Sequence, residues 1–114
     1  MLKVKQITDW RLLNGTSLQG YVDADYKVLC KVFGRPDPNA HDNYKSDAEW
    51  DLEFSDGTVA TIYNYKDGKN YCGASGLAKT KIRDWHVGGR SARAVRNVED
   101  MLERYYAQQE TLTA

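Results

Sequence analysis

The clearest periodicity lies in the middle of the chain, where apolar and polar residues alternate. The apolar positions are Ala48, Trp50, Leu52 and Phe54. The positions between them are Glu49, Asp51, Glu53 and Ser55. A period of two is typical of a strand with one buried and one wet face. An Asp-Gly turn at 56–57 and a β-branched and aromatic run at 59–65 follow. The pattern predicts a β-hairpin over residues 46–65.

Two more strands are predicted after the hairpin. Residues 66–69 read Lys-Asp-Gly-Lys and offer a second turn. We therefore expect residues 70–73 to form a short third strand. Residues 74–78 are small and give no clear indication, and residues 82–87 fit a fourth strand.

A first helix is predicted before the hairpin, over residues 22–33. Its apolar face would consist of Val22, Tyr26, Leu29, Cys30 and Phe33. An aspartate at 23 or 25 would cap the start, and Gly34 followed by Pro36 would end the helix. A strand with Tyr26, Val28, Cys30 and Val32 on one face stays open as an alternative, because short apolar runs are ambiguous.

A second helix is predicted at the C-terminal end, with Ser91 as its N-cap. Its apolar stripe consists of Ala94, Val95, Val98, Met101, Leu102 and Tyr105. Residues 109–114 are expected to fray. The predicted fold is one α+β domain over residues 1–114, in which a small antiparallel sheet centred on the 46–65 hairpin is packed by two helices.

Composition fits one small domain, since the chain has 114 residues and 41% of them are hydrophobic. No apolar run approaches the ~18 residues of a membrane span, and the N-terminus lacks the apolar core of a signal peptide. Cys30 and Cys72 lack metal-ligand spacing and are too few for a disulfide framework. We therefore expect a cytoplasmic protein with two buried thiols.

Charge is balanced overall but segregated along the chain. The net charge is +0, which argues against a general nucleic-acid binder. Residues 36–65 are strongly acidic and residues 66–96 are strongly basic. These blocks either compensate each other within the domain or attract copies of the chain, which would give a homo-oligomer.

The basic block contains a candidate anion site, where Gly88 and Gly89 lead into the Ser91-capped helix. Glycines let backbone amides approach a ligand, and a helix start favours anions. Arg90 and Arg93 can grip phosphate, and an aromatic ring could stack on a base. The expected ligand-binding residues are Trp85, His86, Gly88, Gly89, Arg90, Ser91, Arg93, Tyr63, Tyr65 and Lys66. The alternative is a structural bulge with solvated arginines.

Catalytic and metal chemistry are weakly indicated. His86 is the candidate general acid or base, but no nucleophile signature or partner accompanies it. The polar loop over residues 36–44 holds Asp37, His41 and Asp42, which are too few to define a metal site. We expect a loop there, no metal and no cofactor.

Five short motifs occur in a specific order. They are FGRP at 33–36, DAEW at 47–50, DGTVATIYNYK at 56–66, NYCG at 70–73 and WHVGG at 85–89. This order resembles a family of small bacteriophage proteins, mostly without assigned function, over residues 20–98. The resemblance implies a phage accessory protein in the bacterial cytoplasm and carries no catalytic residues across.

Small phage proteins often act against host defences, so the resemblance suggests that class by association. One hypothesis is sequestration of an anionic, nucleotide-derived signal at the basic site. A second is inhibition of a host defence protein or CRISPR nuclease through the acidic hairpin face and its tyrosines. A third is a small enzyme that degrades such a signal.

Overall fold

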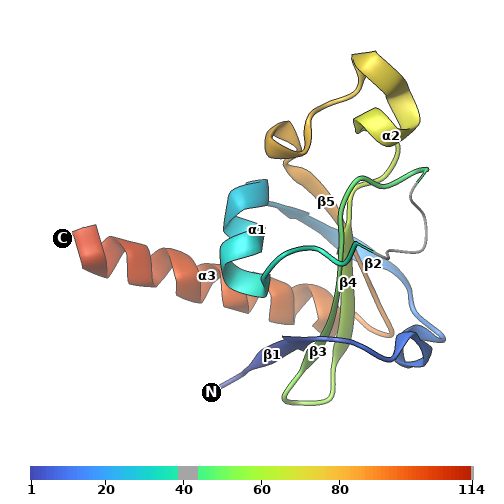
Figure 1. Cartoon of the computed structure of the whole chain (residues 1–114). Helices are drawn as coiled ribbons and strands as arrows, with labels where there is room; N and C mark the ends of the chain where they lie inside the picture. The colour runs from blue at the N-terminus through green and yellow to red at the C-terminus, as the bar shows by residue number, and fades with distance from the viewer. Residues whose placement is uncertain (39–43, 114) are drawn as a thin grey trace.

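The computed structural model describes residues 1–38 and 44–113, and it confirms the α+β prediction. An antiparallel sheet has the strand order β1-β3-β4-β5-β2 (Figure 1). The strands are β1 (Val4–Gln6), β2 (Ser17–Asp23), β3 (Glu49–Phe54), β4 (Val59–Tyr63) and β5 (Asp84–Gly89). The helices are α1 (Tyr26–Phe33), α2 (Lys69–Cys72) and α3 (Arg93–Thr113), with the 3-10 turns η1 (Trp10–Leu13), η2 (Gly73–Ser75) and η3 (Lys79–Lys81).

The predicted hairpin is confirmed as β3 and β4. Trp50 pairs with Ile62, and both side chains are fully buried. At the turn the amide of Phe54 donates to the carbonyl of Thr58, and Gly57 has a φ of 88°. That φ lies in the left-handed region that glycine adopts without strain, so the Asp-Gly pair sets the register of the two strands.

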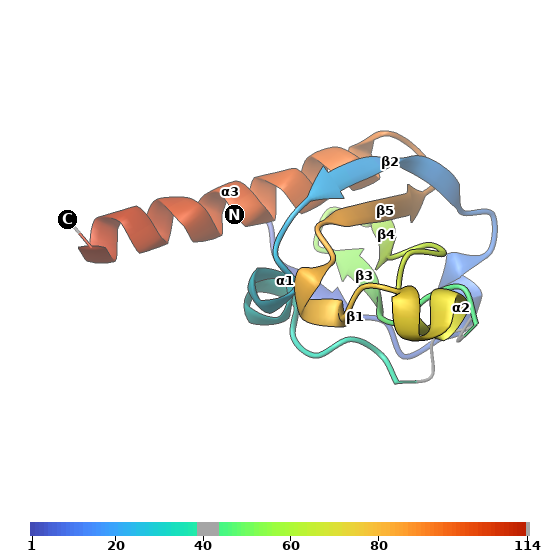
Figure 2. The same cartoon turned by 90° about the horizontal axis from the view of Figure 1, so that it is seen from above.

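Helices α1 and α3 pack on one face of the sheet (Figures 1 and 2). We call these two the long helices, and no helix of their length lies on the opposite face within residues 1–38 and 44–113. The core between the helices and the sheet is centred on Trp50 and Trp85, which are fully buried with ring centroids 5.4 Å apart. The indole N–H of Trp85 donates to the carbonyl of Ala24 at 2.9 Å, just before α1. The indole N–H of Trp50 donates to the carbonyl of Gly34 at 2.8 Å, just after it. The two tryptophans therefore hold both ends of α1 against the sheet.

The first helix is shorter than predicted. Asp25 caps α1 by accepting from the amide of Lys27 at 2.8 Å, and Gly34 ends it with a φ of 87°. The strand alternative for this run is wrong. Val22, which we assigned to the helix, lies in β2 opposite Trp85. Val22 is buried in the core from its position in β2. The spacing of apolar residues therefore could not decide whether it belongs to the strand or to the helix.

The second helix agrees with the predicted stripe. Ala94, Val98 and Leu102 are buried, and Ser91 caps the helix by accepting from the amide of Arg93 at 3.3 Å. Residues 109–113, which we expected to fray, continue the helix. Its second half projects beyond the sheet (Figure 2). No helix in the described ranges is long and apolar enough to cross a membrane.

The predictions for residues 70–73 and 82–87 had different outcomes. The short third strand is wrong, because Lys69–Cys72 forms α2 instead. The last strand is confirmed as β5, displaced by two residues at each end. Cys72 is exposed and Cys30 is half-buried, so the expectation of two buried thiols is wrong.

The segment between β4 and β5 is fixed by one fully buried side chain, Asn64. Its Oδ1 accepts from the amides of Asp47 and Ala48, at 2.7 and 3.1 Å. Its Nδ2 donates to the carboxylates of Asp47 and Asp67, each at 3.0 Å. These bonds join the start of the hairpin to the loop that follows it.

Asn64→Ala removes all of these hydrogen bonds, and the amides of Asp47 and Ala48, which are part-buried and buried, lose this acceptor. At about 1 kcal/mol for each bond, we expect the free energy of unfolding to fall by about 2–4 kcal/mol. Urea denaturation measures the change. Asn14→Ala is the control, because Asn14 is exposed. A loss below 1 kcal/mol for Asn64→Ala would contradict the assigned network.

Candidate functional site

The predicted glycine turn is not a turn. Gly88 and Gly89 lie in β5, where they pair with β2 on one side and β4 on the other, and both are buried. A Cβ added at Gly89 would lie 2.5 Å from the Cβ of Ala94 on α3. This glycine therefore allows a helix, not a ligand, to approach the sheet closely. The expectation of an open anion pocket between the glycines and α3 is wrong.

Trp85 cannot stack on a ligand as we expected. Its ring is fully buried between the sheet and α1, and its N–H is bonded to the carbonyl of Ala24. The alternation along β5 explains the error, because Trp85 and Val87 point into the core while His86 points to the other face.

Arg90 holds a segment of the chain itself. Its Nη2 donates to the carbonyl of Leu12 at 2.5 Å and to that of Asn14 at 3.2 Å, and its Nε donates to Asn14 at 3.3 Å. The guanidinium therefore fastens the η1 segment beside β5. Arg93 is exposed on the first turn of α3. The hydrogen bond from Asn97 is the main cause of the lowered pKa of the Asp56 carboxyl, and the charge of Arg93 adds a smaller effect. The two arginines do not converge.

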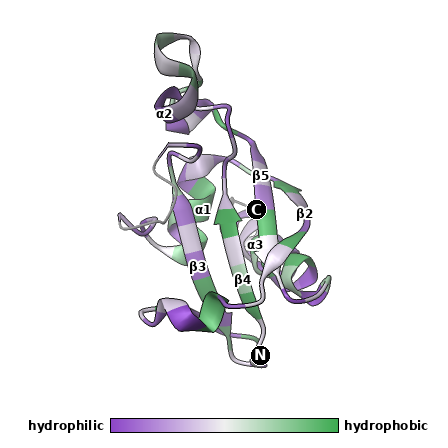
Figure 3. Cartoon of the chain, turned by 90° about the vertical axis from the view of Figure 1, so that its right-hand side faces the viewer, coloured by the Kyte–Doolittle hydropathy of each residue, from purple (hydrophilic) through white to green (hydrophobic). Residues whose placement is uncertain are grey.

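Four of the predicted residues do gather, on the sheet face opposite α1 and α3. Figure 3 looks onto this face of the sheet. The ring of His86 lies 5.4 Å from Tyr63 and 5.5 Å from Tyr65, measured between centroids. Tyr21 of β2 contacts the same imidazole edge-on at 4.9 Å. The ammonium of Lys66 lies 5.1 Å from the ring centre of Tyr65. We call these five residues the tyrosine cluster.

The tyrosine cluster borders a groove of about 290 Å³, which we call the tyrosine groove. Its lining consists of Leu13, Thr16, Ser17, Leu18, Ser46, Glu49, Thr61, Tyr63, Tyr65 and Gly88. Thr61 and Gly88 are cross-strand partners, and a Cβ at Gly88 would lie 2.5 Å from the hydroxyl of Thr61. The missing side chain thus keeps the floor of the groove open. The wall made by Leu13 and Thr16 belongs to the segment that Arg90 fastens.

The electrostatics of the groove come from a phenol and a carboxylate. Glu49 and Tyr63 are direct cross-strand partners, and both are half-buried. Burial raises the pKa of the Tyr63 phenol, and the charge of Glu49 adds to that increase. At neutral pH the Tyr63 phenol is therefore protonated, and its hydroxyl can donate a hydrogen bond in the groove.

The acidic row of β3 is less solvated than expected. Glu49 and Glu53 are half-buried, and Asp51 is buried with 7% exposure. The carbonyl of Asp51 accepts from the amide of Ile7, which keeps the segment after β1 beside this strand. That segment, Asp37 and Asp51 line a separate cavity of about 410 Å³.

The three residues that we considered as metal ligands, Asp37, His41 and Asp42, can be compared with the structure only in part. His41 and Asp42 lie outside the described residues. Within residues 1–38 and 44–113, no three histidine, cysteine, aspartate or glutamate side chains are grouped so that they could hold a metal ion.

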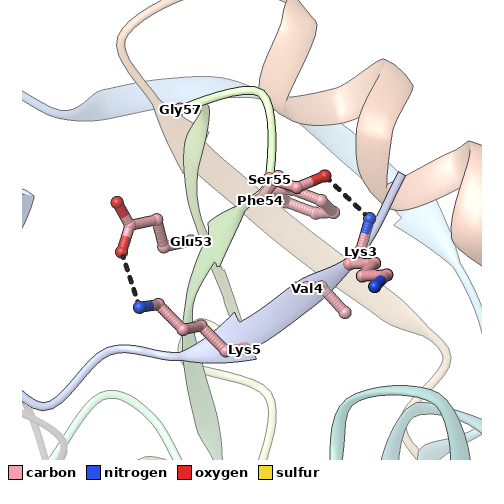
Figure 4. Close-up of a pocket in the computed structure, with 7 residues that line it drawn as sticks. All are labelled: Lys3, Val4, Lys5, Glu53, Phe54, Ser55 and Gly57. Carbon is pink, nitrogen blue, oxygen red and sulfur yellow. Dashed lines mark hydrogen bonds and ion pairs between the residues drawn. The ribbon is translucent and has the colours of Figure 1, made fainter. Parts of the chain in front are cut away.

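A larger cavity of about 510 Å³ lies at the sheet edge beside β1 (Figure 4). The ammonium of Lys5 and the carboxylate of Glu53 are 3.7 Å apart there, and the amide of Lys3 donates to the hydroxyl of Ser55 at 2.9 Å. The carboxylate is thus paired with a neighbouring cation. This cavity shares no lining residue with the tyrosine groove, so we do not include it in the candidate site.

Sequence reasoning missed the N-terminal half of the groove. Leu13 and Leu18 come from residues for which we predicted no element, and Ser46 and Glu49 were assigned only to the hairpin. No local signal marks these residues as a site, because they meet only when β2 pairs with β5 at the far edge of the sheet.

No protein-family model matches the chain, and no curated protein matches it either. The resemblance to small phage proteins therefore stays a prediction, and the site rests on its own geometry.

We expect the Tyr63 phenol to lose its proton above the ordinary value of 10.0. The folded state therefore favours the neutral form, and this contribution to stability is present below pH 10 and lost as the pH rises through the folded pKa. The difference between the ultraviolet titrations of the wild type and Tyr63→Phe isolates this group. In denaturant the difference curve should return to the ordinary value. A native curve at that same value would contradict the burial of the phenol.

Arg90→Ala should release the η1 segment. Hydrogen exchange at the amides of Leu12, Asn14 and Thr16 is expected to accelerate, because their turn bonds lose the anchor. The free energy of unfolding should fall by only about 1 kcal/mol, since the hydrogen bonds are exposed. Arg93→Ala is the matched control and should leave these amides unchanged. Equal exchange in both variants would show that Arg90 does not hold the segment.

Proposed function

We propose that the protein is a non-catalytic binding protein of the phage counter-defence class, which takes the base of a nucleotide-derived ligand in the tyrosine groove. The observation that carries the proposal is the gathering of Tyr63, Tyr65 and His86 on the sheet face without long helices, at the border of that groove. Aromatic rings on an open sheet face are a platform on which bases stack.

The size of the tyrosine groove limits what enters it. Small-molecule sites usually have volumes of about 300–1,000 Å³, and 290 Å³ lies just below that range. We therefore propose that one base occupies the groove while the sugar and phosphate remain outside. Lys66 is the cation of the tyrosine cluster, and its ammonium lies 5.1 Å from the centre of the Tyr65 ring and 5.3 Å from that of Tyr71.

A binding role is favoured over a catalytic one by the position of His86. The histidine packs against three tyrosine rings and is not among the residues that line the groove. A general acid or base must reach the reacting group directly or through one water. We therefore propose that His86 positions the tyrosine rings.

A second candidate function is inhibition of a host defence protein through the same face. Tyr44 and Tyr71 extend the tyrosine cluster outward, with ring centroids 5.0 Å apart, and they are 61% and 39% exposed. Exposed tyrosines are enriched at protein interfaces. Association of copies of the chain through the segregated charges likewise stays a prediction.

Thermal unfolding with a panel of mononucleotides and cyclic nucleotides tests the proposed function. At ten times its Kd, a ligand stabilises the folded state by about 1.4 kcal/mol and should raise the Tm by about 5 °C. Tyr65→Ala should weaken binding by about 5- to 150-fold through lost stacking, with little change in the Tm of the free protein. Tyr106→Ala is the matched control, because Tyr106 on α3 has the same 42% exposure.

Three results would argue against nucleotide sequestration. A cleaved ligand after incubation would assign the protein to the enzyme class. Equal weakening by Tyr65→Ala and Tyr106→Ala would remove the tyrosine groove from the site. No change in Tm with any nucleotide, together with a co-purified host protein lost in Tyr71→Ala, would favour the inhibitor.

A further inference from the structure

Asp51 of β3 carries a buried carboxylate that the fold does not fully satisfy. Its side chain is 7% exposed, and its Oδ1 is buried without a hydrogen-bond partner in the part of the chain that the structure describes. The side chain points away from α1 and α3, because Trp50 and Leu52 on either side of it point into the core. A buried acceptor without a partner destabilises the folded state, so its presence suggests a donor from outside the chain.

Asp51 lines the cavity of about 410 Å³ beside the segment after β1, which we call the acidic cavity. The other lining residues are Gln6, Ile7, Thr8, Trp10, Asp37 and Pro38. None of these described residues is a lysine, an arginine or a histidine. The acidic cavity therefore brings the Asp51 carboxylate together with apolar surface and with no cation of its own lining.

Two cations of the N-terminal segment beside β3 are held by other carboxylates. The ammonium of Lys5 lies 3.7 Å from the carboxylate of Glu53, and the Nε of Arg11 lies 2.9 Å from that of Asp9. A buried charge is costly unless it is paired. An external cation in the acidic cavity would supply the pairing that these two do not give to Asp51.

The size and shape of the acidic cavity indicate the class of cation. Small-molecule sites usually have volumes of about 300–1,000 Å³, and 410 Å³ lies within that range. Because Asp51 is almost completely buried, the approach to its carboxylate is narrow and favours a compact ammonium over a planar guanidinium. The indole of Trp10 is 60% exposed at the border of the cavity, and the face of such a ring attracts cations.

We propose that the acidic cavity is a second binding site, which takes a primary ammonium at the end of an alkyl chain. The ammonium pairs with the carboxylate of Asp51, and the alkyl chain lies against Ile7 and Trp10. The acidic cavity shares no lining residue with the tyrosine groove, so this site stands or falls separately from the proposed function.

Titration with the diamine putrescine, followed by NMR at the amides of Ile7 and Thr8, tests the proposal. These signals should shift and saturate with putrescine, and they should not shift with its analogue that carries hydroxyls in place of the amines. Asp51→Asn should weaken binding by about 10- to 150-fold, the value of a hydrogen bond to a charged group. Trp10→Leu should weaken binding by about 2- to 30-fold through the lost cation–π contact.

Glu53→Gln is the matched control and should keep the wild-type affinity. Glu53 lies two residues after Asp51 on the same face of β3, but it is paired with Lys5 and does not line the acidic cavity. Equal affinities of Asp51→Asn and Glu53→Gln would overturn the proposal. So would equal shifts with putrescine and its hydroxyl analogue, or no shift with either.

The free protein supplies a second measurement. Asp51→Asn removes a buried charge, so without ligand its Tm should be no lower than that of the wild type. A Tm lower by about 5 °C or more, or a failure to fold, would show that Asp51 has a stabilising partner within the chain and would overturn the proposal.

A comparison of putrescine with acetyl-lysine methylamide identifies the source of the ammonium. Tighter binding of putrescine supports a free amine as the ligand, and tighter binding of the lysine derivative supports a lysine side chain of a partner protein. Tighter binding of L-arginine amide than of both would overturn the assignment to an ammonium.

Discussion

The two indole hydrogen bonds at the ends of α1 are the constraint on which the arrangement depends. Trp85 of β5 bonds the carbonyl of Ala24, and Trp50 of β3 bonds that of Gly34. Each bond satisfies a buried polar N–H that would otherwise oppose burial of a large ring. Together they hold α1 against the same sheet face that α3 covers. The other face is therefore left to polar and tyrosine side chains.

The alternation that builds the core also builds the tyrosine cluster. Ile62 and Val87 are cross-strand partners that point inward, and their chain neighbours Tyr63 and His86 are partners that point outward. A shift of register by one residue would bury the rings of Tyr63 and His86 and expose the aliphatic side chains of Ile62 and Val87. The turns at 56–57 and the Asn64 network resist that shift, so the same interactions protect fold and site.

Positive charge has a different role from the one its sequence position indicates. Arg90 follows two glycines and precedes a helix, which is typical of phosphate contacts, yet it bonds the carbonyls of Leu12 and Asn14. Leu12 lies in the 3-10 turn η1, and Asn14 is the residue that ends it. Carbonyls at the end of such a turn need donors from outside the turn. The arginine thereby stabilises one wall of the tyrosine groove, and none of the described residues that line the groove is an arginine or a lysine.

The sequence by itself determined the β3–β4 hairpin and the C-terminal helix α3, because each depends on spacing, capping and turn residues within a few positions. It left the run at 26–33 open between helix and strand. It could not place Val22, the glycines of β5 or residues 70–73, because each has a local pattern that fits more than one element. Only the tertiary structure decided that β2 closes the sheet beside β5, that α3 fills the space above Gly89, and that Glu49 shares a groove with Leu13. The physical reason is that these contacts join residues far apart in the chain, whose proximity depends on how layers pack and not on any periodicity along the sequence.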